Sequence, residues 1–215
     1  MLTLALENSS PQASLALLRG DVLLAERVYR PSSRESGRIF ELFEQLLSET
    51  NTVCADIECY VTGRGPGNYS GMRVVLTMAQ ALALPGKREV LAVSSGAALA
   101  KETMERERRD VVAVVGDARR QRFWMGVFER RDEALVMDCD WRLYSADELR
   151  EALPPGGVVV SSEMDRLPTD DWSGVCRIDE NRYPSACVLA ELASIRIAGG
   201  EAMEPLRPLY MHPPV

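Results

Sequence analysis

The sequence has little of the residue types on which most catalytic and metal-binding sites depend. His212 is its single histidine, which excludes metal sites with two histidine ligands and mechanisms that need a histidine base inside the chain. The five cysteines are scattered without a Cys-x-x-Cys pair, so we expect reduced thiols rather than a disulfide framework or a zinc site. No apolar run reaches the ~18 residues that span a bilayer, and no basic leader precedes the first apolar segment. These absences predict a soluble, cytoplasmic protein without a secretory signal.

What the sequence does contain is typical of a globular protein. Of its 215 residues, 46% are hydrophobic and 27% are charged, a composition that can bury a core. The length suits two lobes of roughly 100 residues each. The formal net charge of −7 argues against tight binding of nucleic acid by this chain alone, because such affinity comes from neutralised phosphates.

The first half of the chain predicts a mixed sheet with helices on its faces. Three apolar runs separated by polar turns predict an antiparallel meander, and helices then alternate with two buried strands. Ser32 and Glu35 fit a capping box before the first helix. The predicted strands are 2–6, 13–18, 22–28, 57–62 and 90–93, and the predicted helices include 39–47, 72–84 and 95–106.

The second half begins with the same order of elements. Strand patterns occur at 111–116, 123–128, 135–143 and 158–160, and helical patterns at 145–153 and 184–198. Residues 205–215 hold four prolines and are expected to be extended. We therefore predict an α/β protein of two domains, residues 1–104 and residues 105–215, the second a smaller, degenerate copy of the first with a proline-rich tail.

Two predicted helices carry apolar stripes that are candidates for a partner interface. The residues of each stripe recur at helical spacing, which is typical of a face packed in a protein's own core. The helix over 72–84 is apolar or small over most of its surface, however, and such a helix is buried on more than one side. Core packing and partner contact therefore both stay open. The stripes are Ile39, Phe43, Leu46 and Leu47, and Val74, Val75, Met78 and Leu82.

The segment 63–73, GRGPGNYSGMR, is the most distinctive in the sequence. Its glycines permit close approach of the backbone to another group, and the helix that follows offers free N–H groups to an anion. No Lys-Ser/Thr pair follows, so it is not a Walker A loop, and Ser70 is out of register with a Gly-x-Ser-x-Gly motif. A tight structural turn and a contact with a ligand or partner are the remaining hypotheses.

An acidic residue stands near the end of the first predicted strand in each half. Glu7, with Ser9 in the turn behind it, and Asp117 hold equivalent positions. Two carboxylates at strand ends are able to hold Mg²⁺, which makes these residues candidates for a nucleotide or metal contact. Lone carboxylates at such positions also form turns, and that interpretation stays open.

A basic cluster follows Asp117 and stands beside two aromatic residues. It consists of Arg119, Arg120 and Arg122, with Phe123 and Trp124 next in the chain. Arginine beside aromatics is typical of RNA contacts. A solvated strand edge whose alternate residues turn inward explains the same pattern.

Several segments resemble the TsaB (YeaZ) family. Residues 63–73 are similar to its GRGPGSFTGVR segment almost residue for residue, and residues 4–10 resemble its opening ALDTS strand and turn, with Glu7 in place of the aspartate. Residues 93–95, 117–124 and 207–210 are similar to further family segments. The glycine-rich resemblance is carried by Arg64, Gly65, Pro66, Gly67, Tyr69, Ser70, Gly71 and Arg73. The resemblance implies two ribonuclease-H-like lobes of the ASKHA, actin-like class.

The resemblance also implies a function. Family members are non-catalytic partners of TsaD, which transfers a threonylcarbamoyl group to the adenosine beside the tRNA anticodon, and the ATPase TsaE joins them. By position, the two apolar stripes correspond to the docking helices. We therefore expect a heterodimer with TsaD, a homodimer when the chain is alone, and tRNA contact only through the complex. We expect no catalytic residue, no metal ligand and no tightly bound cofactor in this chain, with ATP or ADP and Mg²⁺ confined to the complex.

The residues leave a second hypothesis open. A stand-alone enzyme of the same fold class, a phosphotransferase or a hydrolase, would use Glu7 and Asp117 around magnesium-ATP. Binding of magnesium-ATP to the purified chain, followed by slow hydrolysis, would favour this alternative.

Overall fold

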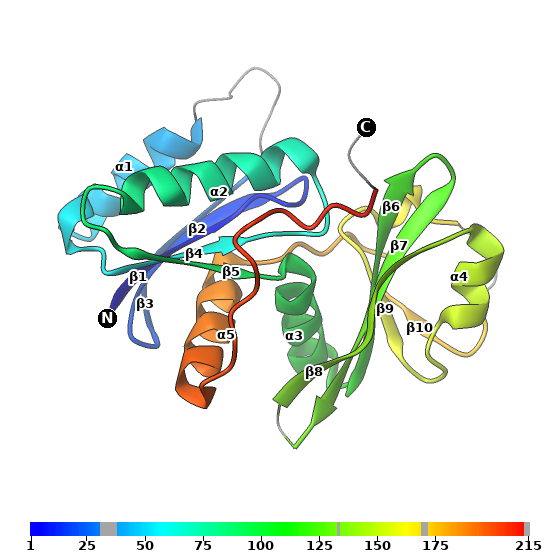
Figure 1. The fold of residues 1–215 in the computed structure, drawn as a ribbon. Coiled ribbons are helices and arrows are strands. Elements are labelled where there is room, and N and C mark those ends of the chain that lie inside the picture. The colour runs from blue at the N-terminus through cyan, green and yellow to red at the C-terminus, as the bar shows by residue number, and fades with distance from the viewer. Residues whose placement is uncertain (31–37, 133, 169–171, 213–215) are drawn as a thin grey trace. The chain divides into compact units, whose positions relative to one another are not determined.

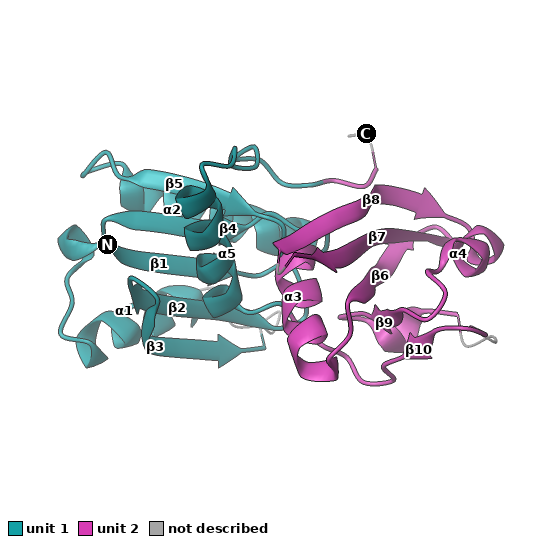
Figure 2. Ribbon diagram, turned by 90° about the horizontal axis from the view of Figure 1, so that it is seen from below, with its two compact units in different colours: residues 1–95, 184–209 teal, residues 96–183, 210–215 magenta. Residues whose placement is uncertain are grey.

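The computed structural model describes residues 1–30, 38–132, 134–168 and 172–212. Their contacts divide the chain into two compact units (Figure 2). Unit 1 consists of residues 1–95 and 184–209, and unit 2 consists of residues 96–183 and 210–215. This division differs from a single boundary at residue 104, because residues 96–104 pack within unit 2 and residues 184–209 return to unit 1.

Unit 1 is built on a five-stranded mixed sheet in the order β3-β2-β1-β4-β5. The first three strands pair antiparallel as the predicted meander, and β4 and β5 continue the sheet parallel to β1. The sequence pattern predicted this mixed sheet correctly. The strands are β1 (Leu2–Glu7), β2 (Ala13–Arg19), β3 (Val22–Tyr29), β4 (Cys59–Gly63) and β5 (Glu89–Val93).

Helices cover both faces of this sheet (Figure 1). On one face, α1 (Arg38–Glu49) packs on β2 and β3, and α2 (Tyr69–Ala83) packs on β1, β4 and β5. On the other face, α5 (Ala186–Gly199) contacts β1, β2, β4 and β5. The alternation of side chains along each strand sorts them between the two faces. Leu15, for example, belongs to the core under α1 and α2, whereas the neighbouring Ser14 accepts a hydrogen bond from the first residue of α5.

The helix starts depend on local capping. α2 begins at Tyr69, three residues before the predicted start, because the side chain of Asn68 accepts hydrogen bonds from the backbone N–H groups of Ser70 and Gly71. The capping box predicted from Ser32 and Glu35 lies outside the described residues. A short 3₁₀ turn, η1 (Cys54–Asp56), connects α1 to β4.

Unit 2 repeats the scheme with a second five-stranded sheet in the order β10-β9-β6-β7-β8. Three long strands form an antiparallel meander, and β9 continues the sheet parallel to β6. No helix among the described residues is long and apolar enough to cross a membrane. The elements are α3 (Ser95–Glu107), β6 (Val111–Arg119), β7 (Arg122–Arg131), β8 (Ala134–Tyr144), α4 (Ala146–Ala152), β9 (Val158–Val160), η2 (Met164–Arg166) and β10 (Cys176–Arg177).

Candidate partner surface and glycine-rich loop

The structure places most residues of the two apolar stripes inside unit 1. Buried members of both stripes pack with the leucines of β1 and β2 in one hydrophobic core, which explains why α1 and α2 form and dock. Val74 alone among the eight is exposed. The other seven residues could contact a partner only if α1 or α2 moved away from the sheet of unit 1. The buried members are Ile39, Phe43, Leu46, Val75 and Met78, and Leu47 and Leu82 are partly buried against the same core.

The same two helices nevertheless keep large apolar side chains on the outside. Phe40 of α1 is 52% exposed, and Val74 and the C-cap residue Leu84 of α2 are 40% and 77% exposed. Tyr69, at the start of α2, is exposed and lies under the guanidinium of Arg73, which donates a hydrogen bond to its hydroxyl at 3.0 Å. We call Phe40, Tyr69, Val74 and Leu84 the outer residues of α1 and α2. Large apolar side chains left exposed on two helices of one core are candidates for an interaction surface.

Helical spacing alone does not separate the outer residues from the stripes. Phe40 stands three and seven residues before Phe43 and Leu47, so the sequence pattern includes it in the first stripe, and Val74 belongs to the second stripe. The structure nevertheless exposes both side chains. The way in which each helix lies on the sheet decides which edge of a stripe is covered, and this is seen only in the structure.

The glycine-rich loop is pressed against the turn that follows β1. A Cβ atom on Gly67, whose φ is +154°, would lie 2.0 Å from the carbonyl oxygen of Ser9, and one on Gly71 would lie 1.9 Å from that of Asn8. The backbone N–H of Asn68 donates to the Ser9 carbonyl at 2.6 Å. Glycine is needed at these positions because two backbones meet there without room for a side chain. This packing supports the structural-turn interpretation of the loop.

Glu7 is fully buried at the end of β1 and is held by its own unit. One carboxylate oxygen accepts a hydrogen bond from the backbone N–H of Ser9 at 2.5 Å, and the other accepts from Oγ of Ser95 at 2.7 Å. Oγ of Ser95 in turn accepts from the N–H of Gly65. Burial raises the pKa of Glu7 above its usual value, and the hydrogen bonds from the two serines oppose this rise. A Cβ on Gly63 would lie 1.8 Å from this carboxylate, so Glu7 fills the space that a side chain there would need.

Asp117 is engaged within unit 2. Its carboxylate accepts the backbone N–H of Arg119 at 2.7 Å and forms an ion pair with the guanidinium of the same residue. That guanidinium also lies 3.5 Å from a carboxylate oxygen of Glu163. Among the residues that the structure describes, no group of three or more His, Cys, Asp or Glu side chains is arranged to hold a metal ion. Glu7 and Asp117 each bond within their own unit, and the magnesium or nucleotide contact stays a prediction.

The basic cluster forms the tight turn between β6 and β7. Arg119, Arg120 and Gln121 all have positive φ values, and Arg122 pairs with Glu148 at 3.1 Å. Trp124 points inward, with its ring 5.5 Å from that of Trp141 in an edge-to-face contact. An inward tryptophan does not offer its ring to a base, which favours the strand-edge interpretation of this cluster over RNA contact.

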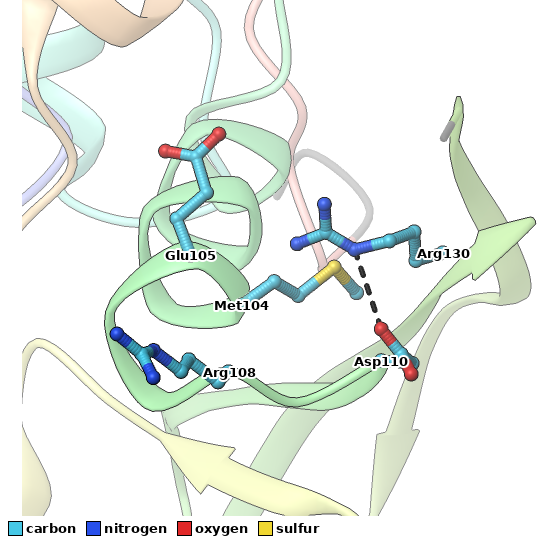
Figure 3. A pocket seen from close by; sticks show the side chains of 5 residues that line it. All are labelled: Met104, Glu105, Arg108, Asp110 and Arg130. Atoms are coloured by element: carbon cyan, nitrogen blue, oxygen red, sulfur yellow. Dashed lines mark ion pairs between the residues drawn. The ribbon is translucent and has the colours of Figure 1, made fainter.

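A hollow in unit 2 lies where α3 ends and the chain turns into β6 (Figure 3). It is lined by Met104, Glu105, Arg108, Asp110 and Arg130, with an ion pair of 3.3 Å between Asp110 and Arg130. Three of the four charged side chains belong to exposed residues, and none of the predicted site residues lines the hollow. The candidate site is therefore the outer side of α1 and α2, with the loop at which α2 begins.

Comparison with known proteins assigns the family. Residues 30–167 match the family model of TsaD, tRNA N6-adenosine threonylcarbamoyltransferase. The tRNA threonylcarbamoyladenosine biosynthesis protein TsaB of Bacillus subtilis is 30% identical over 149 residues, which are 66% of this chain and 64% of that protein. TsaB of Escherichia coli is 25% identical over 172 residues, 80% of this chain and 69% of that protein.

The solved structure of YeaZ from Pseudomonas aeruginosa superimposes with a TM-score of 0.81 at 25% identity, and the match covers 97% of this chain and 99% of that one. The sequence matches are shorter than the proteins themselves: the chain spans 64% of the Bacillus subtilis relative and 55% of the TsaB of Buchnera aphidicola. The family model, the sequence relatives and the common fold agree, and the chain belongs to the TsaB (YeaZ) family within the superfamily of TsaD.

Proposed function

We propose that this chain is a non-catalytic subunit in the biosynthesis of tRNA threonylcarbamoyladenosine, which binds a TsaD-type transferase and thereby activates it. The names of its relatives support the pathway. The observation that carries the mode of action is the exposure of Phe40, Val74 and Leu84 on two helices whose inner faces already complete a core. The outer residues of α1 and α2 are the proposed docking surface.

The proposal extends to the other components. TsaE joins the complex of the two chains, and tRNA is contacted through that complex rather than by this acidic chain alone. ATP or ADP with Mg²⁺ is held in the complex, and this chain binds no cofactor tightly by itself. Without the transferase, the exposed apolar residues pair with those of a second copy. Because tRNA is the substrate of the pathway, the proposed location is the cytoplasm.

Substitution of Val74 by aspartate tests the docking surface. Val74→Asp places a charge at an exposed position of α2 without entering the core. We therefore expect the dissociation constant of the heterodimer with the transferase of the same organism to rise at least ~100-fold, as it does for a central interface residue. Analytical ultracentrifugation or surface plasmon resonance measures the affinity. Val28→Asp is the matched control, because Val28 is also an exposed valine of unit 1 but lies on β3.

Reconstituted modification of tRNA tests the activation. The transferase, the other components and tRNA are assayed with the wild-type chain, with Val74→Asp, or with neither, and we expect product only with the wild type. Retained affinity in Val74→Asp, or full modification without this chain, would contradict the proposal. Calorimetry with magnesium-ATP on the isolated chain addresses the alternative, since binding tighter than millimolar with slow hydrolysis would favour a stand-alone enzyme.

A further inference from the structure

The segment after α5 crosses the end of the sheet of unit 1 (Figure 1). In its course, Glu204 forms an isolated antiparallel bridge with Ala92 of β5. Farther along, the backbone N–H of Leu209 donates to the carbonyl of Arg64 at 2.8 Å. Residues 201–209, which we call the tail segment, thus attach to the free edge of β5 and to the first residues of the glycine-rich loop. The prolines predicted only an extended conformation for residues 205–215.

Glu204 is the centre of the attachment. One of its carboxylate oxygens accepts hydrogen bonds from the backbone N–H of Ser94 at 2.9 Å and from Nη1 of Arg196 at 2.7 Å. The other accepts from Nη1 of Arg64 at 3.0 Å. The side chains of Glu204 and Arg64 are only 20% and 10% exposed, so solvent screens this pair less than the surface ion pairs of the chain.

Arg64 depends on the tail segment to remain buried. Its Nε donates to the carbonyl of Arg207 at 3.0 Å, and its Nη1 donates to Glu204. A buried guanidinium without a carboxylate and hydrogen-bond acceptors is strongly unfavourable. When the tail segment leaves, Arg64 therefore has to turn toward solvent, and the backbone around it loses the bond from Leu209.

Arg64 stands at the start of the glycine-rich loop, which leads directly into α2. Its own N–H donates to the carbonyl of Val93 at 3.0 Å, the N–H of Gly65 donates to Oγ of Ser95, and the loop ends at the N-cap Asn68. The two hydrogen bonds and the N-cap are all made without residues of the tail segment. Tyr69 and Val74, two of the outer residues, lie in the first two turns of α2. Movement of Arg64 is therefore transmitted through the loop to the first two turns of α2, which carry Tyr69 and Val74.

We propose that the tail segment is a latch: when Glu204 is seated, it fixes the glycine-rich loop and the start of α2, and when it is released, this loop and the first turn of α2 become mobile. Glu204 is a positioning residue that acts through Arg64. The latch is a property of the isolated chain. Its consequence for partner binding rests on the proposed function, since the outer residues are useful only if a partner docks on them.

Hydrogen exchange on the full-length chain tests the latch. Glu204→Gln keeps an oxygen for the Ser94 N–H but removes the charge that Arg64 and Arg196 face. We expect the amides of Gly65 and Asn68, whose acceptors are Ser95 and Ser9, to exchange at least about tenfold faster than in the wild type. Amides of α1 should keep their rates. Glu201→Gln, at an exposed position of the same segment, is the control and should change none of them.

Two outcomes would overturn the proposal. If only the Ser94 and Leu209 amides accelerate, the tail segment merely covers the edge of β5. If the amides of α1 accelerate as much as those of the loop, the substitution destabilises unit 1 as a whole. Arg64→Lys provides a second variant: it keeps a charge for Glu204 but loses the Nε donor to Arg207, so we expect a smaller increase at the same Gly65 and Asn68 amides. Unchanged loop amides in Arg64→Lys as well as in Glu204→Gln would count against the latch.

A binding measurement then separates the latch from the proposed function. If the latch and the proposed function both hold, Glu204→Gln weakens binding to the transferase about fivefold or more, because part of the binding free energy goes into ordering the start of α2. Val74→Asp then weakens binding at least ~100-fold. If Val74→Asp binds normally, the proposed function fails while the exchange data still decide on the latch. If Val74→Asp fails to bind and Glu204→Gln binds like the wild type, the docking surface stands and the effect of the latch on it is refuted.

Discussion

The residues around Glu7 show what a single sequence can and cannot predict about a site. Glu7 and Ser9 were identified as candidates because they follow a strand, and the glycines of the loop because glycine permits close backbone approach. The contacts that decide their roles are long-range: Ser95 bonds Glu7 across 88 positions in the chain, and Gly67 meets Ser9. Strand order and register bring these residues together, and neither is written in local spacing.

Glu7 makes the stability of unit 1 dependent on pH. Burial raises the pKa of its carboxyl above the ordinary 4.5, so the folded chain holds the proton to higher pH than the unfolded chain does. The contribution of Glu7 to the free energy of unfolding is therefore fully present below pH 4.5 and is lost as the pH rises through the raised pKa. Relative to Glu7→Gln, which does not titrate, we expect the wild type to lose free energy of unfolding with a slope that approaches about 1.4 kcal/mol per pH unit.

Urea unfolding of the two proteins at a series of pH values between 4 and 8 measures this difference. Glu41→Gln, at an exposed position of α1, serves as the control and should follow the wild type at every pH. A wild type that gains stability relative to Glu7→Gln as pH rises would show instead that the hydrogen bonds from Ser9 and Ser95 outweigh burial.

At the scale of elements, the helices were predicted well and their roles less well. Periodicity identified α1 and α2, because apolar residues at helical spacing mark one face, and a proline at the start indicated α5. It left core packing and partner contact both open for Ile39 and Met78, which the family resemblance placed at a partner interface, and both lie in the core of unit 1. Periodicity tells which residues share a face, but not whether that face meets the protein's own sheet. The start of α2 was missed for a different reason, since the cap at Asn68 takes three residues of the loop into the helix.

Aspartate substitutions at Met78 and Val74 compare a buried and an exposed position one turn apart on α2. Met78 is 4% exposed, so Met78→Asp buries a charge without a partner and should lower the free energy of unfolding by about 3 kcal/mol or more. Val74→Asp meets solvent and should change it by less than about 1 kcal/mol. Chemical denaturation followed by circular dichroism measures both values. Similar losses in the two variants would mean that Val74 is as buried as Met78, and the binding test at Val74 would lose its basis.

At the scale of the whole molecule, both sheets were predictable but the division of the chain was not. Two meanders, each continued by parallel strands, followed from the order of strand and helix patterns. The return of α5 to unit 1 depends on contacts such as the bond from Ala186 to Ser14, which are 172 positions apart. A helix pattern near the end of a sequence carries no sign of which sheet it will cover.

This division predicts how fragments of the chain behave. Residues 1–104 by themselves leave the face of the sheet that α5 covers open to water, including the buried Ala16 and Leu18. We therefore expect this fragment to be unfolded or aggregated, and to recover a cooperative thermal transition when residues 184–209 are joined to it by a flexible linker. Circular dichroism melting and size-exclusion chromatography compare the fragment with and without residues 184–209. A fragment 1–104 that melts cooperatively as a monomer would refute the role of α5 in completing unit 1.

Unit 1 is formed by segments on both sides of unit 2 in the chain, and this order affects folding during synthesis at the ribosome. Synthesis normally lets an early segment finish folding before a later one appears, but here the first sheet waits for α5 and the tail segment, which are made only after all the strands of unit 2. The middle of the chain has all the strands of its sheet by residue 177. Newly made chains thus pass through a stage in which the first sheet is uncovered on one side, and we expect chaperones of nascent chains to bind that apolar surface.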